Sequence, residues 1–176
     1  MKLDSHDFFT KKEVEYIGLQ ETLAFLNKIA IENQINAIFG FSQGAFISLF
    51  ISILMEIDPE YKEAFKNLKC LILSAGFLDP YPTNKEFIVD KDLIQSILLE
   101  KKDSAALNNK LNFAISIPML NVIGVRDDII VKEKSQNISR LFKEWEILYH
   151  DGDHIVPCGN IHIETYVKFL KKYLHK

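Results

Sequence analysis

The feature that most constrains the fold of this chain is a strand-like segment that runs directly into a glycine-flanked serine. Five apolar or small residues, Ile35–Phe39, predict a buried strand and lead into the sequence GFSQG at residues 40–44. An apolar run, Ala45–Met55, follows and has the length of a helix. This order of strand, turn and helix is the context in which G-x-S-x-G forms a nucleophile elbow, a tight turn that exposes a serine hydroxyl. The sequence therefore predicts Ser42 as a candidate nucleophile.

The residues on either side of Ser42 have separate expected roles. Because they lack a Cβ atom, Gly40 and Gly44 are expected to let the strand and the helix pass close together. The backbone N–H of Gln43 opens the helix and is expected to point to the position where an oxyanion would develop. Gln43 is therefore the predicted backbone donor of an oxyanion hole.

A serine nucleophile needs a base and a carboxylate that orients the base, and candidates for both follow downstream. The apolar segment Ile117–Gly124 predicts a strand, and Asp127 comes just past its C-terminal end. Residues 146–150 predict the next strand, and His154 lies in the turn after it. The chain order serine, carboxylate, histidine is typical of α/β-hydrolases. Because the carboxyl ends of parallel strands line one edge of a sheet, Ser42, Asp127 and His154 are expected to meet there.

Other residues offer alternatives for the acid and the base. Asp128 is adjacent to Asp127 and is the alternative carboxylate. A loop histidine such as His154 is more often simply solvated, but the elbow and the chain order favour it as the base. The remaining histidines precede the serine, close a strand or lie on a predicted C-terminal helix: His6, His150, His162 and His175.

Five segments carry motifs that occur together in one enzyme family. FGFSQGA at residues 39–45 matches the nucleophile motif of that family, and HDGDHIVP at residues 150–157 resembles its H-x-G-G-H-x-x-P histidine loop. The helix before the elbow, the S-G-F turn and the acid-bearing stretch have counterparts at residues 18–23, 73–77 and 117–135. In order and spacing the chain thus resembles the FSH-type serine hydrolases, small α/β-hydrolases that include the ovarian-cancer-associated serine hydrolase and its fungal relatives.

The resemblance implies Ser42 as the nucleophile, Asp127 as the acid and His154 as the base. It also implies an enzyme that cleaves carboxylic esters through an acyl-enzyme, with thioesters as the alternative substrates. No metal or organic cofactor is expected, because the sequence lacks a Walker glycine-lysine loop, G-x-G-x-x-G, H-E-x-x-H and paired C-x-x-C motifs.

Helix-like and strand-like segments alternate along the chain, which favours a parallel sheet flanked by helices. The predicted fold class is therefore α/β, an α/β-hydrolase-like sheet in a single domain spanning residues 1–176. Beyond the elbow, helices are expected at Leu19–Glu32, 131–142 and 161–174, a short helix or loop at 59–68, and a further strand at Lys69–Ala75.

The chain departs from the family pattern at its beginning. The family normally starts with a strand whose L-H-G-type turn contributes the second oxyanion donor, and residues 1–16 do not resemble it. We therefore expect either an incomplete N-terminus or an open edge at Ile35–Phe39 that pairs with another copy of the chain. A catalytically weak or inactive binding protein of the same fold is the alternative to an active enzyme.

Two features suggest how a substrate would be held. Residues 78–113 contain Pro80-Tyr81-Pro82 and then a polar, helix-prone stretch, which suits either a lid over the elbow or an ordinary crossover helix. Phe41 and Phe46 flank the elbow and suggest an apolar acyl pocket. Aromatic residues at such positions also belong commonly to the core.

Composition argues against several other classes of function. A net charge of −3 gives no reason to expect nucleic acid or an anionic membrane as a partner. Cys70 and Cys158 make no disulfide framework, so reduced thiols are expected. The N-terminus lacks the apolar region of a signal peptide, and no apolar run approaches the length of a membrane span. We therefore expect a cytoplasmic protein that acts on a small acyl ester or thioester.

Overall fold

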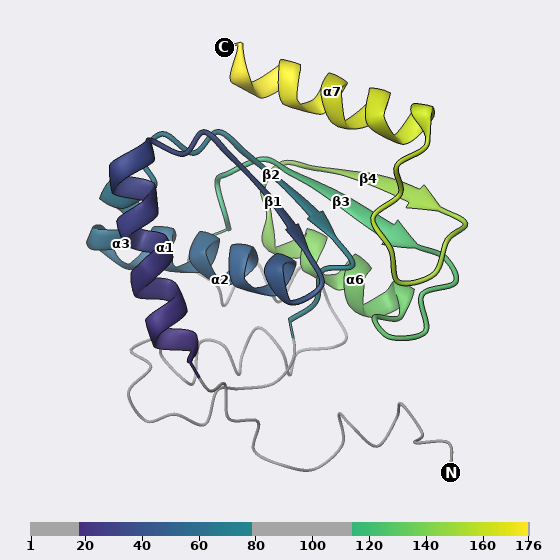
Figure 1. Ribbon diagram of the computed structural model, residues 1–176, viewed down its shortest axis with the longest axis horizontal. Coiled ribbons are helices and arrows are strands. Elements are labelled where there is room, and N and C mark those ends of the chain that lie inside the picture. The colour runs from purple at the N-terminus through teal and green to yellow at the C-terminus, as the bar shows by residue number, and fades with distance from the viewer. Residues whose placement is uncertain (1–17, 79–113, 176) are drawn as a thin grey trace.

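The computed structural model describes residues 18–78 and 114–175 of the chain. Within these ranges, parallel strands form one sheet whose spatial order is the chain order (Figure 1): β1 (Ala37–Phe41), β2 (Cys70–Ser74), β3 (Met119–Gly124) and β4 (Trp145–His150). The expected α/β class is confirmed. Residues 1–17 and nearly all of the lid expected at 78–113 lie outside the described ranges.

Helices cover both faces of the sheet, as parallel strands require (Figure 1). On one face lie α2 (Gln43–Ile57) and α6 (Lys132–Ile138), the latter continued by a short 3-10 helix, η1 (Ser139–Leu141). On the opposite face lies α7 (Asn160–Leu174). Two further helices pack to the side of α2: α1 (Leu19–Asn33) and α3 (Pro59–Ala64).

The inner strands are buried on both faces, so alternate residues enter two different apolar cores. Leu71 and Leu73 of β2 belong to the larger core, under α2. Cys70 and Ile72 belong to the second core, which α7 closes. The side chains that α7 contributes to this second core are Tyr166, Phe169 and Tyr173. The alternation explains why β2 is apolar at every residue from Cys70 to Leu73 rather than at every second residue.

The strand before the serine ends two residues later than the sequence predicts. We expected Ile35–Phe39, but β1 continues through Gly40 and Phe41, which pair with Leu73 and Ser74. The Ser42 N–H then donates to the Ser74 carbonyl oxygen at 2.9 Å. Pairing with β2 therefore fixes the backbone up to the serine itself, although a glycine and its neighbour resemble a turn in the sequence.

The helix expected at residues 131–142 is shorter than predicted. It runs as α6 to Ile138 and then tightens into η1. The Phe142 N–H donates to the Ser139 carbonyl oxygen at 3.2 Å, the shorter bonding pattern of a 3-10 turn. In the same way, the short helix or loop expected at 59–68 is helical only over α3.

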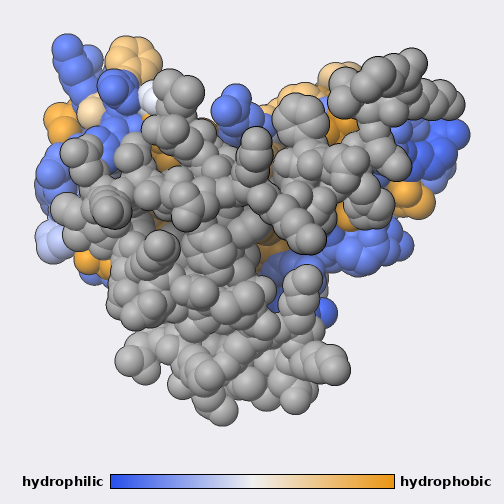
Figure 2. Space-filling model, turned by 90° about the horizontal axis from the view of Figure 1, so that it is seen from below, coloured by the Kyte–Doolittle hydropathy of each residue, from blue (hydrophilic) through white to orange (hydrophobic). Residues whose placement is uncertain are grey.

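Strand β1 pairs with β2 on one side, and within the described residues no strand lies on its other side. Phe39 of β1 is 47% exposed and meets the Tyr166 ring edge-on, with ring centroids 5.6 Å apart. Figure 2 shows the molecule from below the view of Figure 1, and the coloured part of the surface there includes both hydrophilic and hydrophobic residues. No helix in the described ranges is long and apolar enough to cross a membrane.

Candidate active site

Ser42 forms the link between β1 and α2 in a backbone conformation that residues with a Cβ atom rarely adopt. Its φ is 51° and its ψ is −116°. The turn is tight because Gly40 lies directly against the first residues of α2. A Cβ atom on Gly40 would lie 2.6 Å from the Gly44 carbonyl oxygen and 2.7 Å from the Ala45 Cα. No side chain fits there, and the expected role of Gly40 is confirmed.

Gly44 does not have the packing role that the sequence predicts for it. A Cβ atom on Gly44 would meet no atom within 4 Å among the described residues. The close approach between strand and helix thus involves the carbonyl group of Gly44 and does not require its missing side chain. The expectation that both glycines are needed for this packing is wrong for Gly44.

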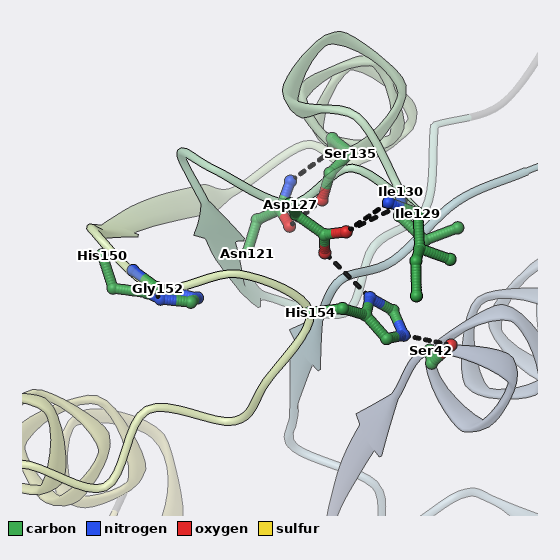
Figure 3. A network of polar contacts seen from close by, with 9 residues as sticks. All are labelled: Ser42, Asn121, Asp127, Ile129, Ile130, Ser135, His150, Gly152 and His154. Carbon is green, nitrogen blue, oxygen red and sulfur yellow. Dashed lines mark hydrogen bonds and ion pairs between the residues drawn. The ribbon is translucent and has the colours of Figure 1, made fainter. Parts of the chain in front are cut away.

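The structure brings the three predicted site residues together at the carboxyl edge of the sheet (Figure 3). His154 Nε2 lies 2.9 Å from Ser42 Oγ, and His154 Nδ1 lies 2.9 Å from Asp127 Oδ2. An ionised carboxylate can only accept, so Nδ1 carries the proton in this arrangement. Nε2 is then free to accept the hydroxyl proton of Ser42. This is the geometry in which an imidazole can remove a proton from a serine.

Asp127 is held by the backbone of its own loop. The carboxyl group is 1% exposed. Its Oδ1 accepts hydrogen bonds from the N–H groups of Ile129 at 3.0 Å and Ile130 at 2.8 Å, which leaves Oδ2 to face the imidazole (Figure 3). Asp128, the alternative carboxylate, is exposed. The structure therefore places Asp127, and not Asp128, against His154.

The loop that carries the acid and the loop that carries the histidine are bonded to each other. The N–H of Val125 donates to the His150 carbonyl oxygen at 2.9 Å, and that of Arg126 to the Gly152 carbonyl oxygen at 3.4 Å. A Cβ atom on Gly124 would lie 2.7 Å from the Asp153 carbonyl oxygen and 2.9 Å from that of Gly152. Glycine at 124 thus lets the histidine turn cross the end of β3 in direct contact.

A buried asparagine anchors the helix that follows the acid loop. Asn121, fully buried in β3, donates to the Ser135 carbonyl oxygen at 2.6 Å and to Ser139 Oγ at 2.9 Å. Its Oδ1 accepts from Ser135 Oγ at 3.3 Å (Figure 3). Asn121 is not among the site residues predicted from the sequence. The signal was present, because an amide inside an apolar strand needs buried partners.

The two aromatic residues beside the elbow have different surroundings. The Phe41 ring lies 4.8 Å from the His154 ring, between centroids, so Phe41 is part of the site. Phe46 is buried and stacks on Phe77 at 5.6 Å inside the larger core. The interpretation of Phe46 as an acyl-pocket residue is therefore wrong, and it is a core residue.

Gln43 is the first residue of α2, so its N–H has no partner within the helix and lies beside Ser42. Residues 1–17, in which the sequence shows no counterpart of the family turn that contributes a second oxyanion donor, lie outside the described ranges. Both cysteines are free, and burial raises the pKa of Cys70 to about 11, which makes its thiol a poor nucleophile. The described residues contain no group of three or more His, Cys, Asp or Glu residues that could hold a metal ion.

Comparison with known proteins identifies the family of this chain. A family model described as serine hydrolase (FSH1) matches residues 3–166. Esterase OVCA2 of Danio rerio is 27% identical over 176 residues, which cover 97% of this chain and 65% of that protein. An esterase of Aedes aegypti is 27% identical over 165 residues, which cover 94% of this chain and 50% of that protein. The chain thus spans between half and two thirds of the length of these relatives.

Solved structures show the same fold. An α/β hydrolase enzyme from the metagenome of sediments of the Mar Chica lagoon, Morocco, superposes with a TM-score of 0.53 at 14% identity. The match covers 88% of this chain and 70% of that one. Because the family model extends over nearly the whole chain and the sheet is that of an α/β hydrolase, the chain belongs to the serine hydrolase (FSH1) family.

Proposed function

We propose that this protein is a serine esterase that hydrolyses small carboxylic esters through an acyl-enzyme. The observation that supports the proposal is a pair of 2.9 Å contacts, one from His154 Nε2 to Ser42 Oγ and one from His154 Nδ1 to Asp127 Oδ2. Relatives that are named esterases, and the family to which the chain belongs, favour the same chemistry.

In the first half of the reaction, Ser42 Oγ attacks the ester carbonyl carbon while its proton passes to His154 Nε2. Asp127 keeps the imidazole in the required tautomer and stabilises the imidazolium that forms. The oxyanion of the tetrahedral intermediate faces the N–H of Gln43. When the intermediate collapses, the C–O bond to the alcohol breaks, and His154 donates its proton to the departing alkoxide.

In the second half, water attacks the acyl-enzyme. His154 removes a proton from the water, and a second tetrahedral intermediate forms at the same carbonyl carbon. Its collapse breaks the bond to Ser42 Oγ, and His154 returns the proton to that oxygen. The carboxylic acid leaves, and the enzyme is restored with no change in its charge. In both halves the proton passes through His154, which lies within hydrogen-bond distance of Ser42 Oγ and of Asp127.

Labelling with a fluorophosphonate probe tests the proposal directly, because such probes react with activated serines. We expect the wild-type protein to be labelled and Ser42→Ala to be unlabelled. Folded wild-type protein that takes no label, or a label on another residue, would overturn the proposal. Comparing kcat/KM for acyl esters with that for matched acyl-CoA thioesters then ranks the two substrate classes, and we expect the esters to be preferred.

A further inference from the structure

His150 is a buried titratable residue that the proposed reaction does not use. It is the last residue of β4 and is only 6% exposed. The structure shows that His150 is a packed histidine. Its ring lies at the junction of three segments: the end of β3, the turn that leads to His154, and the first turns of α7.

Contacts with all three segments define the position of the ring. The N–H of Gly152 donates to His150 Nδ1 at 3.2 Å (Figure 3). A Cβ atom on Gly124 would lie 3.1 Å from His150 Cε1, and one on Gly152 would lie 2.9 Å from His150 Nδ1. The ring of His162, on α7, approaches edge-on with centroids 6.3 Å apart. The imidazole is therefore packed against Gly124 and Gly152, and Gly152 lies two residues before His154.

The hydrogen bond to Gly152 defines the protonation state that the structure needs. Nδ1 accepts a hydrogen bond from a backbone N–H, so it cannot carry a proton itself. The proton of the neutral ring must then lie on Nε2. Protonation of Nδ1 would bring an N–H group of His150 face to face with the Gly152 N–H, so that neither has an acceptor there. It would also place a positive charge in a buried site. The hydrogen bond from the Gly152 N–H to the His150 ring is consequently present only while His150 is neutral.

We propose that neutral His150 is a positioning residue for the reaction: by accepting the Gly152 N–H it fixes the turn that holds His154 between Ser42 and Asp127. This inference rests on the proposed esterase function. His150 touches no reacting atom and acts only through the backbone of residues 151–153. The Gly152 carbonyl oxygen of the same turn accepts a hydrogen bond from the Arg126 N–H in the acid loop. Loss of the hydrogen bond between Gly152 and His150 therefore loosens the loops that carry His154 and Asp127.

The surroundings of His150 favour the neutral state. Burial lowers the pKa of His150 below its ordinary value of 6.5, and the neighbouring His162 lowers it further. The carboxylates of Asp127 and Asp151 oppose this shift but do not reverse it. The folded protein therefore binds the proton of His150 less readily than the unfolded chain does. The resulting stabilisation is complete above pH about 6.5 and is lost as the pH falls through the lowered pKa.

Two substitutions at residue 150 distinguish the effect of the hydrogen-bond acceptor from the effect of the volume of the ring. In His150→Asn the amide Oδ1 takes the place of Nδ1 and cannot be protonated in the working range of pH. His150→Leu retains apolar bulk and has no acceptor. We expect His150→Asn to keep kcat near the wild-type value and His150→Leu to lower kcat by about 10- to 100-fold, with a smaller change in KM.

The pH dependence gives a readout that a purely structural role would not produce. In the wild type, protonation of His150 should add a separate fall of about 10- to 100-fold to the acid limb of kcat/KM, because it removes the acceptor for the Gly152 N–H. In His150→Asn the acid limb should return to a single titration. The melting temperature of the wild type should also fall more than that of His150→Asn between pH about 7 and about 5.

Nitrogen-15 NMR of the histidine rings tests the positioning role of His150 without a measurement of catalysis. We expect His150 to be protonated on Nε2 at neutral pH. The Nδ1–H signal of His154, bonded to Asp127, should persist in His150→Asn and be lost or broadened in His150→Leu. Equal kcat in all three proteins, equal damage in both variants, or a proton on His150 Nδ1 would overturn the inference. A wild-type protein that neither hydrolyses esters nor labels at Ser42 would instead overturn the proposed function, and the His154 signal would still test the positioning.

Discussion

Ser42 is the residue at which the proposed chemistry and the stability of the chain conflict. Its backbone, with φ of 51°, lies in a region where a Cβ atom crowds the neighbouring peptide groups. Residues held in such conformations cost of the order of 1–3 kcal/mol. The surrounding contacts impose the conformation, because the Ser42 N–H is bonded to β2 while α2 begins at the next residue. The strained turn is what directs the hydroxyl toward His154.

This strain predicts an unusual order of stability among variants of Ser42. Both Ser42→Ala and Ser42→Gly remove the hydroxyl, but only glycine relieves the backbone. We expect Ser42→Gly to be more stable than Ser42→Ala by roughly 1 kcal/mol, since the strain relieved exceeds the extra entropy of a glycine in the unfolded chain. Urea unfolding measures the difference. An alanine variant as stable as the glycine variant would show that the backbone at residue 42 is unstrained.

The carboxylate assignment gives a second prediction at the level of single residues. Asp127→Asn keeps the shape of the side chain but presents the wrong hydrogen-bonding groups to His154 Nδ1, and it should lower kcat by about 10⁴-fold. Asp128→Asn, at the exposed neighbouring residue, is the matched control and should leave kcat near the wild-type value. Circular dichroism checks that both variants fold. A large loss of activity in the Asp128 variant alone would shift the acid by one residue.

At the scale of elements, the crossing of β1 and α2 depends on one glycine of the pair. In Gly40→Ala the new methyl group would meet backbone atoms, which cannot move without displacing the helix, so we expect destabilisation of roughly 1–3 kcal/mol. In Gly44→Ala the methyl group meets open space among the described residues, and alanine favours the helix by about 1 kcal/mol. Thermal unfolding compares the two. Equal melting temperatures would contradict the packing seen at Gly40.

Most elements could be predicted because their signals are local. The apolar runs that became β2 and β3, and the amphipathic pattern of α1, depend on periodicity alone. The end of β1 could not be predicted, because its pairing with Ser74 is a contact between distant residues. The split between α6 and η1 was missed for a similar reason. A helical pattern in the sequence does not show where the last turn tightens.

Of the residues at the candidate site, some could be predicted from the sequence and others could not. Motif and chain order led to Ser42, Asp127 and His154, which the structure brings within hydrogen-bond distance, although their catalytic roles stay a prediction. The supporting residues were not found in advance. Asn121 and His150 matter through the atoms that surround them, and those atoms come from other elements. Gly44 shows the opposite error, since a motif residue was given a packing role that the structure does not support.

At the scale of the whole molecule, the edge at β1 carries the prediction of self-association. Pairing between copies of β1 would use the backbone groups on the side of β1 where the described residues place no strand. If it occurs, Phe39→Lys should weaken it, because a charge on the strand opposes pairing. Phe25→Lys, at an exposed phenylalanine on α1, is the matched control. Sedimentation velocity over a range of concentrations measures the effect. A wild-type chain that sediments as a monomer at all concentrations would contradict the prediction.

The identity of spatial order and chain order in the sheet has a consequence for synthesis. A chain emerging from the ribosome can add each strand to the one made before it, so β1 and its elbow can form early. His154 lies 112 residues after Ser42, and the turn that carries it follows β4. A nascent chain would therefore present a strained serine with no base beside it. If the chain hydrolyses esters as proposed, such a nascent chain would be inert toward them until β4 has docked and the turn after it has brought His154 beside Ser42.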